Sequence, residues 1–436
     1  MNTKTLKARL CRPLAITPAL ALLFSTDAHA IDAAGIDVHG SVSVTASYSD
    51  TYNYLGNTSK NPDLNLVDVI VNGTHRFENG LRVGAQVYGY TIGDYSDVTL
   101  DWANLDYSFK PWFGVRLGRN KLPMGLYNDS QDLDSVRTFA SLPITFYPKT
   151  FRAITSAFDG LSLYGNIGLG RGGSVDYQVF GGTKQDVNGD APFVRGTSNL
   201  TTYSKWDFQA PVFGTSLFWN TPIEGLRLGY SITDLPKGSL RGVLAQSKDM
   251  RDWALGIPAM VDGAMGAGAW DNSGLFAGTP SDTLDMKVLF QVYSAEYTRG
   301  KWLFAGEYKL IDVTKGYDHT PAFAMLHMPV DTPYSAYMEE YYGMVTYQAT
   351  EKLGLGLYYS YENVARRDPG SSSNPAQYTK DCAAAVSYAL NRAWIVKLEG
   401  HLMNGRSQTF TAGDDNRTSG IDNSWTYLVV KATFSF

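Results

Sequence analysis

A mixed group of charged side chains lies in one segment of the sequence, at about residues 120–159. Its cations are Lys121, Arg137, Lys149 and Arg152, and its carboxylates are Asp129, Asp132, Asp134 and Asp159. Arg119 lies at the start of the segment, and Arg82 and Arg116 lie upstream of it. Such side chains can attract small ions through their charge, or they can pair with one another and hold the segment in place. The sequence leaves both alternatives open for each residue.

No motif of enzyme chemistry accompanies these charges. The histidines after residue 30 are His39, His75, His319, His327 and His401, and none belongs to an HExxH or similar motif. The stretch GLGRGG at residues 168–173 has a glycine content typical of phosphate loops, but it joins two predicted strands and no helix follows. Cys382 is the only cysteine after residue 30, which excludes a two-cysteine redox motif. The sequence predicts no catalytic residues, no metal and no cofactor.

The elements that must position the charged segment are long strands. In IDVHGSVSVTASYS, residues 36–49, apolar and polar side chains alternate over 14 positions. The C-terminal run WTYLVVKATFSF alternates in the same way and ends at Phe436. A soluble strand is commonly about 5–6 residues long, whereas a tilted membrane-crossing strand needs about 9–11. The pattern therefore predicts strands that cross a membrane.

Short and long connections alternate between these runs. Tight turns are predicted at residues 78–80, 111–112, 170–173, 221–225, 299–301, 350–352 and 391–392. Longer loops are predicted at about residues 50–63, 92–98, 120–159, 185–204, 234–285, 314–333, 366–377 and 405–423. Bacterial outer-membrane barrels have this alternation, with short periplasmic turns and long external loops. The expected fold is all-β, an antiparallel up-and-down transmembrane barrel of about 16 strands.

The first 30 residues have the features of a secretory signal. Four basic residues precede the short apolar run ALALLF, and Ala28-His29-Ala30 has the form of a cleavage site. Residues 31–436 are then expected to form a single barrel domain with 33 basic and 41 acidic side chains, a net charge of −8. That balance excludes a generally basic nucleic-acid-binding protein. Export and membrane-crossing strands together place the protein in the bacterial outer membrane, in contact with its lipid and lipopolysaccharide.

The stretch LGRNKLPMGLYNDSQDLDSVRTFASLPITFYP, residues 117–148, resembles the bacterial porin superfamily. The similarity is greatest to the phosphate-selective porin O/P-like and dicarboxylate-selective porins, through the strand-ending Gly-Arg, the Pro-x-Gly-Leu and the Asp-rich run before Tyr147-Pro148. The resemblance implies a homotrimer in which each protomer has its own pore. It also implies that the long loop after the fifth strand folds inward and narrows the channel. The terminal Phe436 resembles the signal through which such barrels contact their assembly machinery.

Selectivity in such a pore depends on its diameter and on the charges at the constriction. The expected selectivity residues share a position on the inward loop or on the adjoining wall: Arg82, Arg116, Arg119, Lys121, Asp129, Asp132, Asp134, Arg137, Lys149 and Arg152. Basic residues outnumber acidic ones in this set, so the sequence favours passive diffusion of small anions such as phosphate or dicarboxylates.

Three alternatives remain open. Tyrosines including Tyr88, Tyr90, Tyr341 and Tyr358 could form a sugar-binding slide, but sugar channels are expected to have 18 strands. A barrel enzyme would need a histidine paired with serine or aspartate at the rim. An adhesin would need a plugged interior, and no plug-sized segment precedes the first strand. The large loop at about residues 234–285 has no assigned role.

Overall fold

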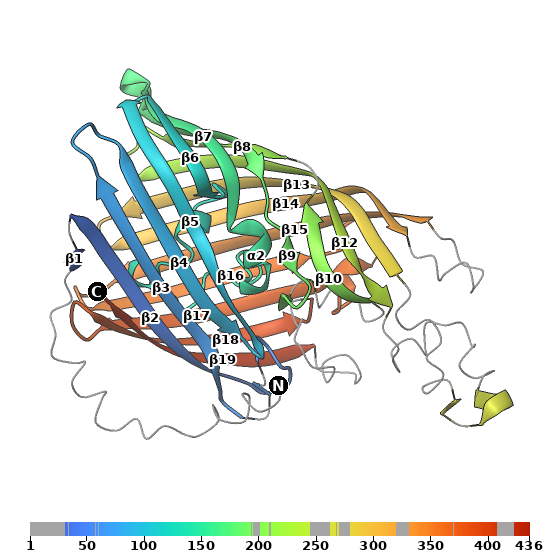
Figure 1. The fold of residues 1–436 in the computed structure, drawn as a ribbon. Helices are drawn as coiled ribbons and strands as arrows, with labels where there is room; N and C mark the ends of the chain where they lie inside the picture. The colour runs from blue at the N-terminus through green and yellow to red at the C-terminus, as the bar shows by residue number, and fades with distance from the viewer. Residues whose placement is uncertain are drawn as a thin grey trace.

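The computed structural model describes residues 31–436 except 34, 57, 60, 193, 195–200, 209–210, 245–261, 267, 270–279, 320–330, 369 and 408–422. Within these residues the chain is mostly β-strand (Figure 1). None of the helices in the described residues is long and apolar enough to cross a membrane.

Sixteen antiparallel strands form a closed barrel in the described part of the chain. In chain order they are β2 (Ile36–Ser49), β3 (Asp63–Arg76), β4 (Arg82–Ile92), β5 (Tyr95–Lys110), β6 (Phe113–Lys121), β7 (Ala157–Gly168), β8 (Ser174–Thr183), β11 (Val212–Asn220), β12 (Leu226–Leu244), β13 (Pro280–Arg299), β14 (Trp302–His319), β15 (Asp331–Gln348), β16 (Leu353–Asn363), β17 (Tyr378–Ala389), β18 (Trp394–Gly405) and β19 (Ser424–Ser435). The predicted fold class is confirmed.

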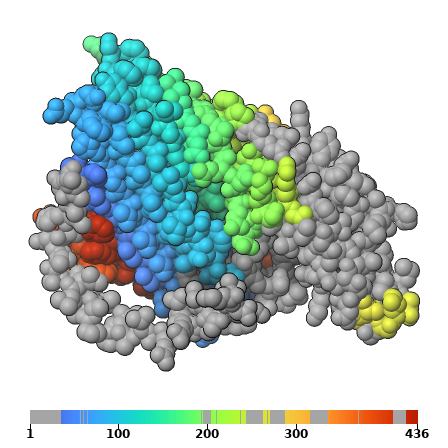
Figure 2. Space-filling view, viewed as in Figure 1, coloured from blue at the N-terminus to red at the C-terminus, as the bar shows by residue number. Residues whose placement is uncertain are grey.

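The barrel closes between its first and last strands. β19 pairs with β2 from Tyr427–Ser49 to Ser435–Ser41, and Phe436 exchanges backbone hydrogen bonds of 3.0 and 2.9 Å with Gly40. A spanning sheet has to close in this way, because an unpaired strand edge in hydrocarbon leaves polar groups without partners. Figure 2 shows the near face of the barrel, where β2 to β8 run from blue to green.

Alternating side chains give the wall two different faces. On β19, Leu428 and Val430 are 50% and 47% exposed, whereas Tyr427 and Val429 are each 1% exposed. The inward face also carries buried charged groups, among them Lys397 and Glu399 on β18. An apolar outer face and a polar interior are the arrangement that a lipid-embedded barrel requires.

The short connections at one end of the barrel lie where the sequence predicts them. The seven predicted tight turns all lie between consecutive barrel strands, for example at residues 77–81 between β3 and β4. The prediction of a longer loop at residues 92–98 is wrong, because β4 ends at Ile92 and β5 begins at Tyr95. Gly93, with φ +60°, allows the chain to reverse within two residues. The strands also extend further than expected on both sides of the predicted loop 234–285, which lies largely outside the described residues.

Three further strands lie outside the barrel ring. β1 (Ile31–Ala33) pairs with the start of β2, and β10 (Thr201–Phe208) pairs with the extension of β12 and with the short β9 (Val187–Asn188). The connection from β6 to β7, residues 122–156, contains η3 (Asn128–Ser130), η4 (Asp134–Val136), η5 (Lys149–Phe151) and α2 (Arg152–Thr155). In Figure 1, α2 lies between the near and far strands.

Candidate functional site

The segment 122–156 contacts inward side chains on well-separated parts of the barrel wall. The backbone N–H of Leu126 donates to Glu307 of β14 at 2.8 Å, and that of Gly125 donates to Ser231 of β12 at 3.0 Å. The backbone N–H of Ala140 donates to Glu399 of β18 at 2.6 Å. A connection between β6 and β7 can reach these strands only by crossing the interior of the barrel.

Aromatic side chains of the segment pack against the same far strands. Phe139 lies 5.0 Å from Tyr358 of β16 between ring centroids, and Phe146 lies 5.1 Å from Tyr342 of β15. All four rings are buried. Gly356, next to Tyr358 on the strand, leaves room for Phe139, since a Cβ at residue 356 would lie 2.6 Å from that ring. These contacts fix the segment by apolar packing as well as by hydrogen bonds.

Asp134 is the centre of a buried charge cluster between the segment and the wall. It lies 3.0 Å from Lys397 and 2.9 Å from Lys431, and Thr433 donates a hydrogen bond to it at 2.6 Å. Arg137 lies 3.6 Å away within the segment. Burial would raise the pKa of Asp134, but the surrounding cations outweigh burial and lower it. Asp134 therefore stays ionised and attaches the segment to β18 and β19.

A second cluster joins the segment to β5 and β6. Lys121 lies 2.5 Å from both Asp101 and Asp132, and Arg152 lies 2.6 Å from the same two carboxylates. Arg152 also stacks over the ring of Tyr88, 3.9 Å from its centroid. Burial acts to raise the pKa of Asp132, and Arg152 and Lys121 lower it further than burial raises it. Two cations thus neutralise two carboxylates in this cluster.

Most of the predicted selectivity residues form ion pairs. Lys149 pairs with Asp68 of β3 at 2.6 Å, Arg116 with Asp106 of β5 at 3.1 Å, and Arg119 with Asp159 of β7 at 3.2 Å. Of the seven predicted cations, Arg82 alone has no ion-pair partner among the described residues. For the other six, the structure favours the alternative in which they hold the segment and the wall together.

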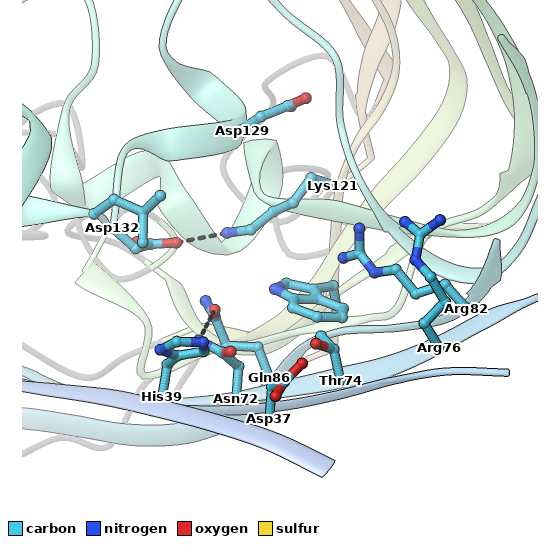
Figure 3. Close-up of a pocket in the computed structure, with 12 residues that line it drawn as sticks. Asp37, His39, Asn72, Thr74, Arg76, Arg82, Gln86, Lys121, Asp129 and Asp132 are labelled. Atoms are coloured by element: carbon cyan, nitrogen blue, oxygen red, sulfur yellow. Dashed lines mark hydrogen bonds and ion pairs between the residues drawn. The ribbon is translucent and has the colours of Figure 1, made fainter. Parts of the chain in front are cut away.

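Arg82 lines an open cavity of about 590 Å³ inside the barrel (Figure 3). The other lining residues, from the wall and the segment, are Asp37, His39, Asn72, Thr74, Arg76, Gln86, Trp102, Lys121, Asp129, Asp132 and Leu133. Arg76 and Arg82 are direct partners in the β3–β4 register, so their side chains lie next to one another. Arg76 also lacks an ion-pair partner in the part of the chain that the structure describes.

Asp129 is one of the three cavity-lining residues from segment 122–156, with Asp132 and Leu133, and Figure 3 shows it across from the two arginines. Its side chain is exposed to the lumen, yet the surrounding wall partly removes it from water and raises the pKa of Asp129 to about 6, against the opposing charges of Lys121 and Arg116. The two unpaired arginines and this carboxylate therefore carry charges of opposite sign on opposite sides of one cavity.

Sequence reasoning missed Arg76. The predicted tight turn at residues 78–80 contains the signal that would have found it, because a hairpin closed there places residue 76 opposite residue 82. The tyrosine slide, one of the alternatives left open by the sequence, is not assembled as one surface. Tyr88 and Tyr90 stack inside the barrel at 5.0 Å, whereas Tyr341 lies on the outer face, because its neighbours Glu340 and Tyr342 are the buried inward residues of β15.

A histidine–carboxylate cluster lies elsewhere in the wall. His401 lies 3.1 Å from Asp381 and 2.9 Å from Glu399, and the three side chains are fully buried. Tyr358 donates to Asp381 at 2.7 Å. A substrate cannot reach this cluster without opening the packed interior, so its geometry fits support of the wall rather than hydrolysis.

The fold and the interior define the class of this protein. A closed barrel with an apolar outer face, short connections at one end and, apart from residues 93–94, longer ones at the other is an outer-membrane β-barrel. Sixteen strands give the porin form of that barrel, which is wide enough for an aqueous lumen.

Comparison with solved structures agrees with this class. The anion-selective porin from Comamonas acidovorans is 12% identical, with a TM-score of 0.51 over 92% of this chain and 99% of that one. The outer-membrane channel DcaP of Acinetobacter baumannii is 9% identical, with a TM-score of 0.52 over 94% and 100%. OmpF of Salmonella typhi, in complex with daunomycin, is 14% identical, with a TM-score of 0.51 over 92% and 97%. These similarities show the porin fold. No protein-family model and no curated protein matches the sequence.

Proposed function

We propose that the protein is a passive channel for small hydrophilic solutes in the outer membrane, with a preference for anions such as phosphate or dicarboxylates. The observation that carries the proposal is the pair Arg76–Arg82, which faces the lumen cavity without ion-pair partners among the described residues. Guanidinium groups present planar donors that match carboxylate and phosphate oxygens. The other predicted cations are compensated by neighbouring carboxylates and add little net attraction.

The segment 122–156 is proposed to narrow the channel. It crosses the lumen and divides the interior, with the 590 Å³ cavity on one side and a second cavity of about 370 Å³ on another, lined by residues such as Arg137, Thr138 and Lys352. Asp129 facing Arg76 and Arg82 creates a transverse field across the larger cavity. Such a field favours small, polar, oriented solutes.

The test is ion selectivity of the purified protein in a planar bilayer under a KCl gradient. We expect discrete conductance steps and a reversal potential that favours chloride, and Arg76→Gln/Arg82→Gln should shift that potential toward potassium. The control is Arg299→Gln/Arg392→Gln, which removes two cations from the short turns and should leave the potential unchanged. Potassium selectivity in the wild type would refute the anion preference, and absence of conductance from a folded barrel would refute the open channel.

We further propose a homotrimer. An apolar groove of about 950 Å³ lies on the outer face of β2 to β6, with small residues such as Gly73, Ala85 and Ala103 at its floor. Small residues allow a second barrel to approach closely, as they do between membrane helices. Bulky substitution at Ala85 and Ala103 to Trp should dissociate the oligomer in light scattering of the detergent-solubilised protein. A monomeric wild type would refute this part of the proposal.

The remaining sequence predictions are retained as proposals. Residues 1–30, the proposed cleaved signal, lie outside the described residues, and residues 31–436 form the proposed single barrel domain. Contact of Phe436 with the assembly machinery is proposed on its place in the closing strand pair. No catalytic activity is assigned. The similarity to the phosphate-selective porin O/P-like and dicarboxylate-selective porins remains a prediction.

A further inference from the structure

A row of tyrosines crosses the outer face of five neighbouring strands, β12 to β16. Each is the direct register partner of the next: Tyr230, Tyr293, Tyr308, Tyr341 and Tyr361. Each alternates with an inward residue, as Tyr308 does with Glu307 and Lys309. Toward the short turns the same outer face is apolar, with Phe304 and Leu357 about half exposed. An aromatic row bordering an apolar surface marks a membrane–water interface.

A basic cluster lies at this row and just beyond it, toward the long loops. We define it as Arg366 and Arg367, which follow β16, and Lys380 on β17. Lys380 is the register partner of Tyr361, and it shares the outward strand face with the exposed Cys382. The backbone N–H of Arg366 bonds to the carbonyl of Tyr337 at 2.9 Å, which fixes the two arginines against β15.

Neighbouring carboxylates compensate only part of the positive charge of the cluster. Arg366 lies 3.1 Å from Glu339 and donates to the hydroxyl of Tyr308 at 2.9 Å, and its side chain is still 42% exposed. Arg367 reaches only to 4.0 Å from Asp312, and its side chain is 66% exposed. Lys380 has no carboxylate partner among the described residues.

Aromatic rings hold the same three cations in place. Arg366 and Arg367 lie 5.7 and 4.2 Å from the ring centroid of Tyr337, and Lys380 lies 5.0 Å from that of Tyr378. Glu339 binds Arg366, and Tyr378 supports Lys380. Both are direct register partners of Asn363, which lies on the strand between theirs. Two strand spacings of about 4.8 Å put these supports roughly 10 Å apart. The cluster is therefore small enough to contact one head group.

We infer that this cluster binds the phosphate groups of a phosphorylated glycolipid in the outer leaflet. The inference rests on the proposed outer-membrane function, because that orientation places the long-loop end of the barrel in the external leaflet. Arginine and lysine at an interface attract anionic head groups, and exposed guanidinium donors match phosphate oxygens. The tyrosine row positions the acyl chains next to the apolar outer face and leaves the head group at the level of the cations.

The test measures binding of bisphosphorylated lipid A to the purified full-length protein in detergent, by native mass spectrometry. We expect Arg367→Gln/Lys380→Gln to weaken binding on the order of tenfold, because each of the two removed cations contributes to the attraction of an anionic head group. Monophosphorylated lipid A should bind more weakly than the bisphosphorylated form, and phosphatidylcholine should not respond to the substitutions. Arg299→Gln/Arg392→Gln, at the opposite end of the barrel, should behave as the wild type.

The results separate this inference from the channel proposal. Arg367 and Lys380 lie outside the lumen, so the Arg367→Gln/Lys380→Gln protein should conduct as the wild type does in phosphatidylcholine bilayers. Equal lipid A affinity in this variant and the wild type would overturn the inference and leave the channel proposal intact. A loss of affinity in both double variants would also overturn it, because it would show attraction by overall charge.

Discussion

Asp134 provides the sharpest test of how the lumen segment is held. Asp134→Asn keeps the shape of the side chain but removes the charge that compensates Lys397 and Lys431, at 3.0 and 2.9 Å. Lys397 has no exposed side-chain surface, so the substitution leaves a buried cation without its carboxylate. Removal of one partner from a buried ion pair typically costs about 3–5 kcal/mol. We expect this loss to weaken the attachment of residues 122–156 to β18 and β19.

The expected result is a large change in the channel record. A loss of about 3 kcal/mol changes the ratio of attached to detached segment by a factor of more than about 100. In single-channel recordings, Asp134→Asn should therefore show larger conductance or frequent transitions between levels. Lys397→Met in the Asp134→Asn background should recover part of the wild-type behaviour, because it removes one uncompensated cation.

The matched control is Asp129→Asn, which removes a carboxylate from the same segment at a residue without an ion pair among the described residues. Its single-channel trace should stay as steady as that of the wild type. A steady, wild-type trace from Asp134→Asn as well would refute the reasoning. The segment would then be held by the packing of Phe139 on Tyr358 and of Phe146 on Tyr342.

Three further predictions concern the cavity and the segment. Anion preference should increase as the pH falls from about 7 to about 5, because Asp129, with its pKa raised to about 6, loses its negative charge in that range. Reversal potentials measured against pH should change less in Asp129→Asn, and an equal pH dependence in this variant and the wild type would refute the assignment to Asp129. Anion preference should weaken between 0.1 and 1 M KCl, because the Debye length falls from about 10 Å to about 3 Å and screens Arg76 and Arg82; an unchanged permeability ratio would mean that pore size alone sets selectivity. Gly125→Ala should lower the free energy of unfolding by about 1–3 kcal/mol, because a residue at φ +66° with its Cβ 2.6 Å from Glu307 is strained. The temperature at which the folded, heat-modifiable band disappears from gels should be lower than for Gly168→Ala, where a Cβ has open space.

The barrel could be predicted from the sequence because its signal is local. Alternation in residues 36–49 is visible within one strand, and the turn at 78–80 is marked by Asn79-Gly80. The error at residues 92–98 has a local cause too, since the polar residues there favour a loop, whereas Gly93 permits a two-residue turn. Strand ends are decided by pairing, which a single strand does not reveal.

The charged site could be predicted only in part because its partners are distant in sequence. The sequence shows Lys149 as a cation of the segment, but its carboxylate partner is Asp68, 81 residues away. Asp134 meets Thr433 across 299 residues. Whether a cation is compensated or available to a solute depends on these long-range contacts, and periodicity contains no information about them. Arg82 is predicted from its place on a strand, whereas its neighbour Arg76 can be predicted only from the register of the hairpin.

The pairing of β2 with β19 also determines when this protein can become stable. Ser43 and Thr433 share a hydrogen bond across 390 residues, so one edge of β2 has no permanent partner until the last strand has been synthesised, although β3 pairs with its other edge. Contacts of such sequence separation form slowly because loop-closure entropy opposes them. Until closure, β2 presents an open edge to other chains, which is a template for aggregation. The protein is therefore most prone to aggregation between its synthesis and the closure of the barrel, and chaperones should matter most during that time.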